Sequence, residues 1–246
     1  MLFDYTRNTE REETFRRGRL LPSMMQNTRW QILQILKRSG GNTVEELCHA
    51  LDLAPMTVRQ HLAILERDGH VVPGGDRRGH GRPSHLYMLS AAADDLFPKG
   101  YDRLLVRLLH EVVHLQPEDI AGKTHEQKLS LMLDRMAEGQ AVTLATQLRG
   151  ATLDERGSEL AALLSEHEGT LSSWSHDDKG YVMEDYNCPV RAVVDSHPEL
   201  CQWHLRLLGT VLNADIQDEG CIAAGASCCR HRIVQRTEPA TETSAR

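Results

Sequence analysis

The sequence predicts a two-domain α+β protein of 246 residues. Apolar residues recur at helical spacing in several stretches, and short extended segments bounded by glycine or proline lie between them. Composition also changes along the chain: charges nearly balance over residues 1–98, whereas the remainder is acidic and holds five of the six cysteines. We therefore expect one domain over residues 1–95 and a second over residues 96–240.

The composition is ordinary for a globular protein, with 40% hydrophobic and 26% charged residues. No stretch approaches the ~18 to 20 apolar residues of a membrane span. The polar, charged start MLFDYTRNTEREETFRRGRL is unlike a secretory signal. We expect a cytoplasmic protein without a membrane partner, whose cysteines are reduced and available as ligands or reactive thiols.

The first domain has the pattern of three helices followed by two strands. A capping box, Thr43 followed by Glu46, starts the second helix, and Pro55 occupies the first turn of the third. Glycine-containing turns end the first and third helices. The expected helices cover residues 24–37, 44–51 and 55–67, and the expected strands cover residues 70–72 and 84–89. This order is typical of a winged helix-turn-helix.

The third helix has the composition of a DNA-reading element. Val58, Leu62 and Leu65 form an apolar stripe, which leaves the opposite face outward. Threonine, glutamine and arginine at the N-terminal end of such a helix can contact base edges or phosphates. The outward residues are Met56, Thr57, Arg59, Gln60 and Ala63, of which we predict Thr57, Arg59 and Gln60 to bind DNA.

The loop between the two strands, residues 73–83, combines four glycines with arginines at positions 77, 78 and 82. We predict that Arg77, Arg78 and Arg82 contact backbone phosphate or a minor groove. A solvated helix face with a charged turn, or a protein-binding module, is the alternative, and the arginine-rich wing favours DNA. The net charge of −7 does not oppose this, because DNA affinity needs only a local basic face.

We expect the partner to be a double-stranded DNA operator bound by a homodimer. Helix-turn-helix proteins usually bind two half-sites one helical turn apart, ~34 Å. The amphipathic helix that starts at Tyr101 is a candidate dimer element, although a helix that covers the core has the same pattern. Helices are expected over residues 101–113, 124–147, 154–168 and 198–212, and strands over residues 180–186, 222–224 and 230–234, which together make a helical, small-sheet sensor domain.

Cysteine spacing is the second informative feature. Twelve residues separate Cys188 from Cys201, and 27 more precede Cys229. This spacing fits neither the paired knuckles of common zinc modules nor ferredoxin-type runs, so a folded domain must bring the ligands together. Thiolates favour zinc, copper(I) or iron–sulphur clusters, whereas a single such cysteine can also be a small buried hydrophobe. Further candidates are Cys221, Cys228, His197, His204 and His231.

Two resemblances extend these observations. TVRQHLAILERDGHV resembles the recognition helix of ArsR/DeoR-like winged-helix repressors. From about Asn27 to Val234 the chain resembles SufR-type repressors of iron–sulphur cluster assembly. The segments that carry this second resemblance are GRPSHLYMLS, LFPKGYDRLLVRLL, NCPVRAVVDSHPELCQWHLRLLG and GCIAAGASCCRHRIV.

The resemblance implies that Cys188, Cys201 and Cys229 bind an iron–sulphur cluster, the four-iron form rather than the two-iron form. Some relatives have a further cysteine about midway between the second and last, and this chain has none there. The fourth ligand stays open among Asp215, Cys221, Cys228 and a histidine. The expected protein is a cluster-sensing transcriptional regulator that represses cluster-assembly genes.

Two other functions remain as alternatives. One is a zinc- or thiol-responsive winged-helix repressor that uses the same cysteines. The other is an enzyme or small-molecule-binding protein with an appended DNA domain. The sequence has no glycine-rich phosphate loop, nucleophile elbow or HExxH helix, so we expect no enzyme activity.

Overall fold

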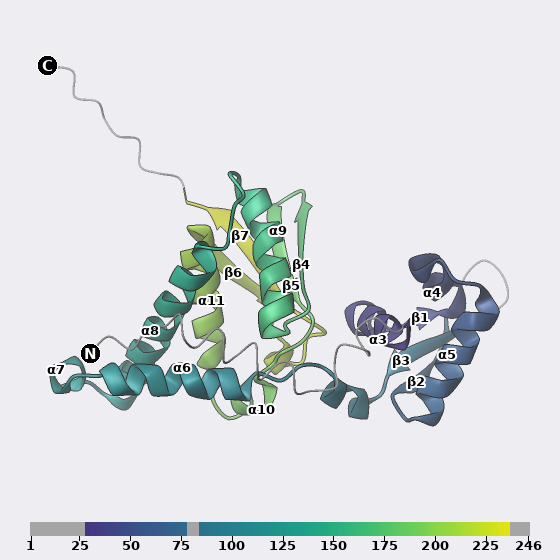
Figure 1. Cartoon of the computed structure of the whole chain (residues 1–246), viewed down its shortest axis with the longest axis horizontal. Helices are drawn as coiled ribbons and strands as arrows, with labels where there is room; N and C mark the ends of the chain where they lie inside the picture. Colours follow the sequence, from purple (N-terminus) through teal and green to yellow (C-terminus); the bar gives the residue numbers. More distant parts are fainter. Residues whose placement is uncertain (1–27, 78–83, 237–246) are drawn as a thin grey trace, which may run out of the picture. The chain divides into compact units, whose positions relative to one another are not determined.

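The computed structural model describes residues 28–77 and 84–236, and the chain divides into two compact units after Asp94 (Figure 1). The first unit contains three helices and a small sheet, and the second contains several helices and a four-stranded antiparallel sheet. This mixed α+β architecture confirms the predicted fold class. In the described ranges, no helix is both long enough and apolar enough to cross a membrane.

The helices of the first unit follow the sequence signals closely. They are α3 (Thr28–Ser39), α4 (Val44–Leu51) and α5 (Pro55–Arg67). The predicted bounds of α4 and α5 are confirmed, whereas residues 24–27 of the first predicted helix lie outside the described residues. At the start of α4, the Thr43 hydroxyl accepts from the backbone N–H of Glu46, and the Glu46 carboxylate accepts from the N–H of Thr43. This reciprocal cap satisfies two helix-terminal donors and fixes where α4 begins.

The sheet of the first unit is larger than predicted. Strands β2 (Val71–Arg77) and β3 (Ser84–Leu89) pair antiparallel, and the short strand β1 (Asn42–Thr43) pairs with β3 on its other side. The prediction that the first strand ends at Val72 is wrong. Gly74 and Gly75 instead form an irregularity within β2, where a Cβ on Gly74 would lie 2.4 Å from the Met88 sulphur. The glycines mark a bulge and a close approach, not a strand end.

The second unit is built around one antiparallel sheet in the order β4-β5-β7-β6. Its strands are β4 (Ser172–Asp177), β5 (Gly180–Asp185), β6 (Ala214–Gly220) and β7 (Cys229–Gln235). The predicted strand over residues 222–224 is wrong, because Ile222–Ala224 is a 3₁₀ turn. The sequence did not reveal β4 or β6, because SSWSHD and ADIQDEG are polar and lack the apolar alternation of a half-buried strand.

Two helices of the second unit cover one face of this sheet, and a third packs on one of them. The principal helices are α6 (Tyr101–His114), α8 (His125–Ala145), α9 (Leu153–Leu163) and α11 (Leu200–Leu212), with the short α7 (Pro117–Ile120) and α10 (Arg191–Val194). Helix α9 contacts β4 and β5, α11 contacts β6, and α8 packs on α11 (Figure 1). The predicted helix over residues 154–168 is α9 continued by a π turn, Leu164–Glu168.

The two faces of the four-stranded sheet differ in chemistry. On one face Arg230 and Arg232 of β7 form ion pairs with acidic residues of β4, β5 and β6. Side chains alternate along a strand, so Cys229, His231 and Ile233 of β7 point to the opposite, helix-covered face. The burial of His231 and Ile233 agrees with this alternation. The candidate ligands therefore lie on the core side of the sheet.

Helix α6 presents one charged stripe inward and an apolar stripe outward. Arg103 and Arg107 donate to Glu168, whose side chain is 14% exposed and also accepts from the Gln140 amide at 3.0 Å. No residue of α6 is fully buried, although Leu104 packs against the core, and seven large apolar side chains of the helix are more than one-third exposed. They are Tyr101, Leu105, Val106, Leu108, Leu109, Val112 and Val113.

Replacing Glu168 with glutamine should lower the free energy of unfolding by about 2 to 3 kcal/mol at neutral pH. Loss of one partner leaves buried charges uncompensated, and the effect is below the ~3 to 5 kcal/mol of a fully buried pair because the arginines are partly exposed. Burial alone would raise the pKa of Glu168, but Arg107 and Arg103 outweigh it and hold the pKa below its ordinary 4.5. The stabilisation is therefore present above 4.5 and is lost as pH falls through the lowered pKa.

Urea denaturation of the wild type and of Glu168→Gln over this pH range measures the effect. Glu166→Gln, on an exposed neighbour of the same turn, is the matched control. A difference between wild type and Glu168→Gln that stays constant on acidification would show that the charge of Glu168 is not what anchors α6.

Candidate DNA interface and metal-ligand sites

The N-terminal end of α5 offers an exposed polar surface. Val58, Leu62 and Leu65 are buried at 0 to 3% exposure, which confirms the predicted inward stripe. Arg59 and Gln60 are exposed and Thr57 is half-buried on the other side of the helix. The helix begins at Pro55, directly after the turn that follows α4, as the second helix of a helix-turn-helix does. Arg59 and Gln60 are thus exposed to solvent, and the DNA contacts predicted for the three residues stay predictions.

The predicted wing is described only in part. Arg77 is the last residue of β2 and its backbone pairs with Ser84 of β3. Arg78 and Arg82 lie outside the described residues. The phosphate contacts predicted for these three arginines stay predictions.

Four thiols of the second unit lie on or close to four different elements. Cys188 lies three residues beyond the end of β5, and Cys201 is the second residue of α11. Cys221 directly follows β6, and Cys229 is the first residue of β7, opposite Asp185 of β5. The sequence-predicted ligands Cys188, Cys201 and Cys229 therefore surround one end of the sheet, with Cys221 beside them.

The thiols interact with one another. The Cys201 and Cys221 sulphurs are 3.8 Å apart, and Cys229 Sγ accepts from the backbone N–H of Ile222, next to Cys221, at 3.3 Å. Burial raises the pKa of Cys188, Cys201 and Cys229, and a negative charge on Cys221 raises each of the three further. Thiolates this close repel one another, so their joint deprotonation needs a cation among them.

The other candidates for a fourth ligand lie elsewhere or face other groups. Asp215 is near the start of β6, about 17 Å along the strand from Gly220, and its carboxylate accepts from Arg236. The pKa of Cys228 is raised first by burial and then by the charge of Glu184. His197 is exposed. Cys221 is the candidate that lies against the predicted ligands.

A second group of possible ligands lies close to the thiols. It consists of Asp185, His204 and His231, whose donor atoms all lie within 4.8 Å of one another. Within the described ranges, no other group of three or more histidine, cysteine, aspartate or glutamate side chains meets this criterion. Both histidines are among the candidate ligands predicted from sequence, whereas Asp185 is not. The spacing between cysteines and histidines could have indicated this group. His204 is three residues after Cys201 on one helix, and His231 is two residues after Cys229 on one strand, so each histidine shares a face with a cysteine.

Comparison with known sequences identifies the first unit. Residues 25–72 match the family described as winged helix-turn-helix DNA-binding. The match covers α3, α4, α5 and the start of β2, so the chain carries a winged helix-turn-helix DNA-binding domain. No curated protein and no solved structure gives a significant match.

Proposed function

We propose that this DNA-binding regulator senses an iron–sulphur cluster held by Cys188, Cys201, Cys229 and Cys221, and represses genes of cluster assembly. The observation that carries the proposal is the gathering of four thiols from four elements at one end of the sheet. The likeness of the cysteine-bearing segments to SufR-type repressors supports the same cofactor and the same class of target gene.

A cluster and a single zinc ion differ in the sulphur spacing that they need. Zn–S bonds of ~2.3 Å in a tetrahedral site place sulphurs about 3.8 Å apart. Cys201 and Cys221 have that spacing, so this pair also suits zinc. We propose the cluster over the zinc-responsive alternative because of the likeness of the cysteine-bearing segments to SufR-type repressors.

Cys221 is proposed as the fourth ligand because of its contacts. Its sulphur approaches Cys201, and its charge acts on all three other thiols. Burial raises the pKa of Cys188, and the positive charge of Arg191, which also donates to the carbonyl of Ile222, offsets part of that rise. The turn that holds Cys221 is thereby fixed to the segment that holds Cys188.

A bound cluster would supply a link whose presence depends on oxygen and on iron supply. The residues of this chain determine what such a link constrains. Cys188, Cys201, Cys221 and Cys229 tie together the ends of β5, α11, β6 and β7. Cluster binding can change DNA affinity only if it favours one arrangement of the two DNA-binding domains of a dimer over another. A tenfold change in affinity needs a free-energy difference of ~1.4 kcal/mol between the two arrangements.

The proposed functional unit is a homodimer joined through α6. A second copy is the occupant we assign to the exposed apolar stripe, because a winged helix-turn-helix reads one half-site and an operator presents two. Leu105, Leu109 and Val113 recur every four residues and are 54, 51 and 76% exposed. That spacing forms a continuous stripe on one face of the helix, the surface that helix–helix packing requires.

Arg59 is proposed to contact a base edge, because it is exposed near the start of α5. Replacing it with alanine should weaken operator binding by ~1 to 3 kcal/mol if the contact is bidentate, and should relax preference at one base position. A gel-shift titration against operator and single-base variants measures both effects. Arg67→Ala, at the exposed C-terminal end of the same helix, is the control. Equal losses for the two variants would assign Arg59 only a general electrostatic role.

The cofactor itself is tested by absorption spectroscopy and by iron and sulphide analysis of anaerobically purified protein. Iron with an equivalent amount of acid-labile sulphide and a visible chromophore is the expected result. Zinc without sulphide would assign the thiols to the zinc-responsive alternative.

A further inference from the structure

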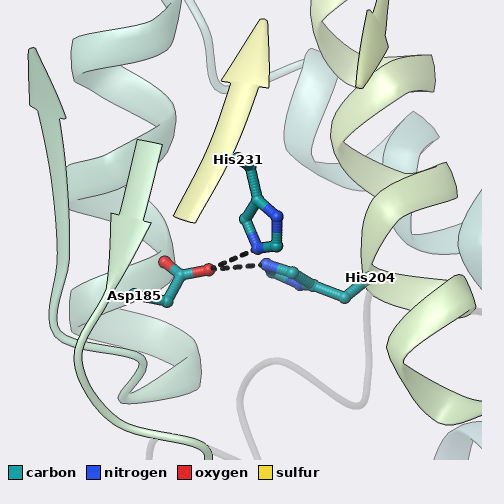
Figure 2. A group of neighbouring side chains, drawn as sticks. All are labelled: Asp185, His204 and His231. Atoms are coloured by element: carbon teal, nitrogen blue, oxygen red, sulfur yellow. Dashed lines mark hydrogen bonds and ion pairs between the residues drawn. The ribbon is translucent and has the colours of Figure 1, made fainter. Parts of the chain in front are cut away.

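Asp185, His204 and His231 converge from three different elements (Figure 2). Asp185 ends β5, His204 lies on α11 and His231 lies on β7. The His204 Nε2 is 2.8 Å from Asp185 Oδ2, and the His231 Nε2 is 3.7 Å from the same oxygen. The side chains of Asp185 and His231 are only 4 and 5% exposed.

His231 has no hydrogen bond that explains its burial. Both of its ring nitrogens are buried without a hydrogen-bond partner among the described residues. Nε2 points toward Asp185, and Nδ1 is 3.6 Å from Asp218 Oδ1, too far for a hydrogen bond in either case. A buried polar group without a partner is rare in folded proteins, and here it lies within reach of two further metal-binding side chains.

We propose that Asp185, His204 and His231 bind one divalent transition-metal ion of the zinc or iron(II) class. Two imidazole nitrogens and one carboxylate oxygen form the donor set of many zinc and non-haem iron(II) sites. The three donor atoms come within 4.8 Å of one another, a spacing that suits a single ion. This inference goes beyond the proposed function and does not depend on a cluster being present.

The surroundings orient these donors. The Ser172 hydroxyl donates to Asp185 Oδ1, which leaves Oδ2 directed at the histidines. Asp218 faces the other nitrogen of His231, as carboxylates do behind metal-bound histidines.

The proposed site lies beside the thiols, because Asp185 pairs with Cys229 across β5 and β7. Asp185 precedes Cys188 by three residues, His204 follows Cys201 by three, and His231 follows Cys229 by two. These spacings put both members of each helix or strand pair on one face. An ion at the site would therefore fix the three elements that also carry thiols.

The test uses the full chain with serine at positions 188, 201, 221 and 229, so that only nitrogen and oxygen donors remain. Titration with Co²⁺, a spectroscopic probe for zinc sites, should show one bound equivalent with visible d–d bands and no thiolate-to-cobalt charge transfer. His204→Ala or His231→Ala in this background should abolish the bands, and Asp218→Ala should weaken binding about 10- to 100-fold. His197→Ala, on an exposed histidine, should change nothing. Displacement of Co²⁺ by Zn²⁺ or by anaerobic Fe²⁺ distinguishes the two ions.

A second measurement keeps the proposal testable if the serine variant does not fold. Cadmium NMR of the wild-type chain separates ions bound by sulphur from ions bound by nitrogen and oxygen. We expect a nitrogen/oxygen-type resonance that His231→Ala removes and His197→Ala retains. Its absence, or its persistence in His231→Ala, would overturn the proposal and leave Asp185 and His204 as a buried ion pair. Iron and sulphide content of the wild type tests the thiols separately, so the two proposals fail independently.

Discussion

Replacing Cys201 with serine is expected to abolish the visible absorption of anaerobically purified protein and to weaken operator binding at least tenfold. Cys201 is half-buried and its sulphur contacts Cys221, so its loss removes a proposed ligand from the middle of the thiol group. Ser at Cys188, Cys221 or Cys229 should have the same effect, because each ties a different element to the site. Absorption spectra and operator titrations on the same samples measure the two losses together.

Two cysteines of this chain provide matched controls. Cys228→Ser alters the neighbour of Cys229, and Cys48→Ser alters a half-buried thiol of α4 in the first unit. Both variants should keep the chromophore and bind the operator like the wild type. If Cys228→Ser loses the chromophore and Cys221→Ser retains it, the assignment of the fourth ligand to Cys221 is wrong.

Substituting glutamate for Leu105 and Leu109 together is expected to convert the proposed dimer to a monomer and to weaken operator binding by roughly 10²- to 10⁴-fold. When two DNA-binding domains are linked in a dimer, binding of the first makes binding of the second intramolecular and therefore tighter. A monomer loses this gain in affinity. Because both side chains are more than half exposed, the substitution should leave the fold of each chain intact. Light scattering gives the mass, and operator titration gives the affinity.

The matched control is His110→Glu, which adds the same charge at an exposed polar position of α6. It should remain dimeric with full affinity. If the double variant still has the mass of a dimer, the dimer contact lies elsewhere than on α6. If the wild type is a monomer that binds a single half-site, the proposed homodimer is wrong.

The helices of the first unit could be predicted from sequence because the signals that define them are local. The capping box at Thr43 and the proline at the start of α5 define helix ends within three or four residues, and the stripe of Val58, Leu62 and Leu65 defines the buried face. β1 was missed because two residues carry no periodicity. Its pairing with Tyr87 and Leu86 of β3 arises from tertiary contact alone.

The strands of the second unit were harder to predict because its sheet depends on contacts between residues distant in sequence. Strand β7 pairs with β5, almost fifty residues earlier, and the polar β6 occupies an edge where one face is solvated. The same long-range pairing decides the site. Spacing named Cys188, Cys201 and Cys229, but only the fold brings Cys221 to Cys201 and Asp185 to the two histidines. The roles of all these residues stay predictions.

The most direct test compares operator binding by one preparation of the protein before and after removal of the proposed cluster under anaerobic conditions. DNA titrations at one fixed salt concentration avoid the electrostatic contribution that changes with ionic strength. We expect the protein with the proposed cluster to bind the operator at least tenfold more tightly than the protein without it. Equal affinity of the two forms, or protein that binds no iron while its four thiols are reduced, would contradict the proposal.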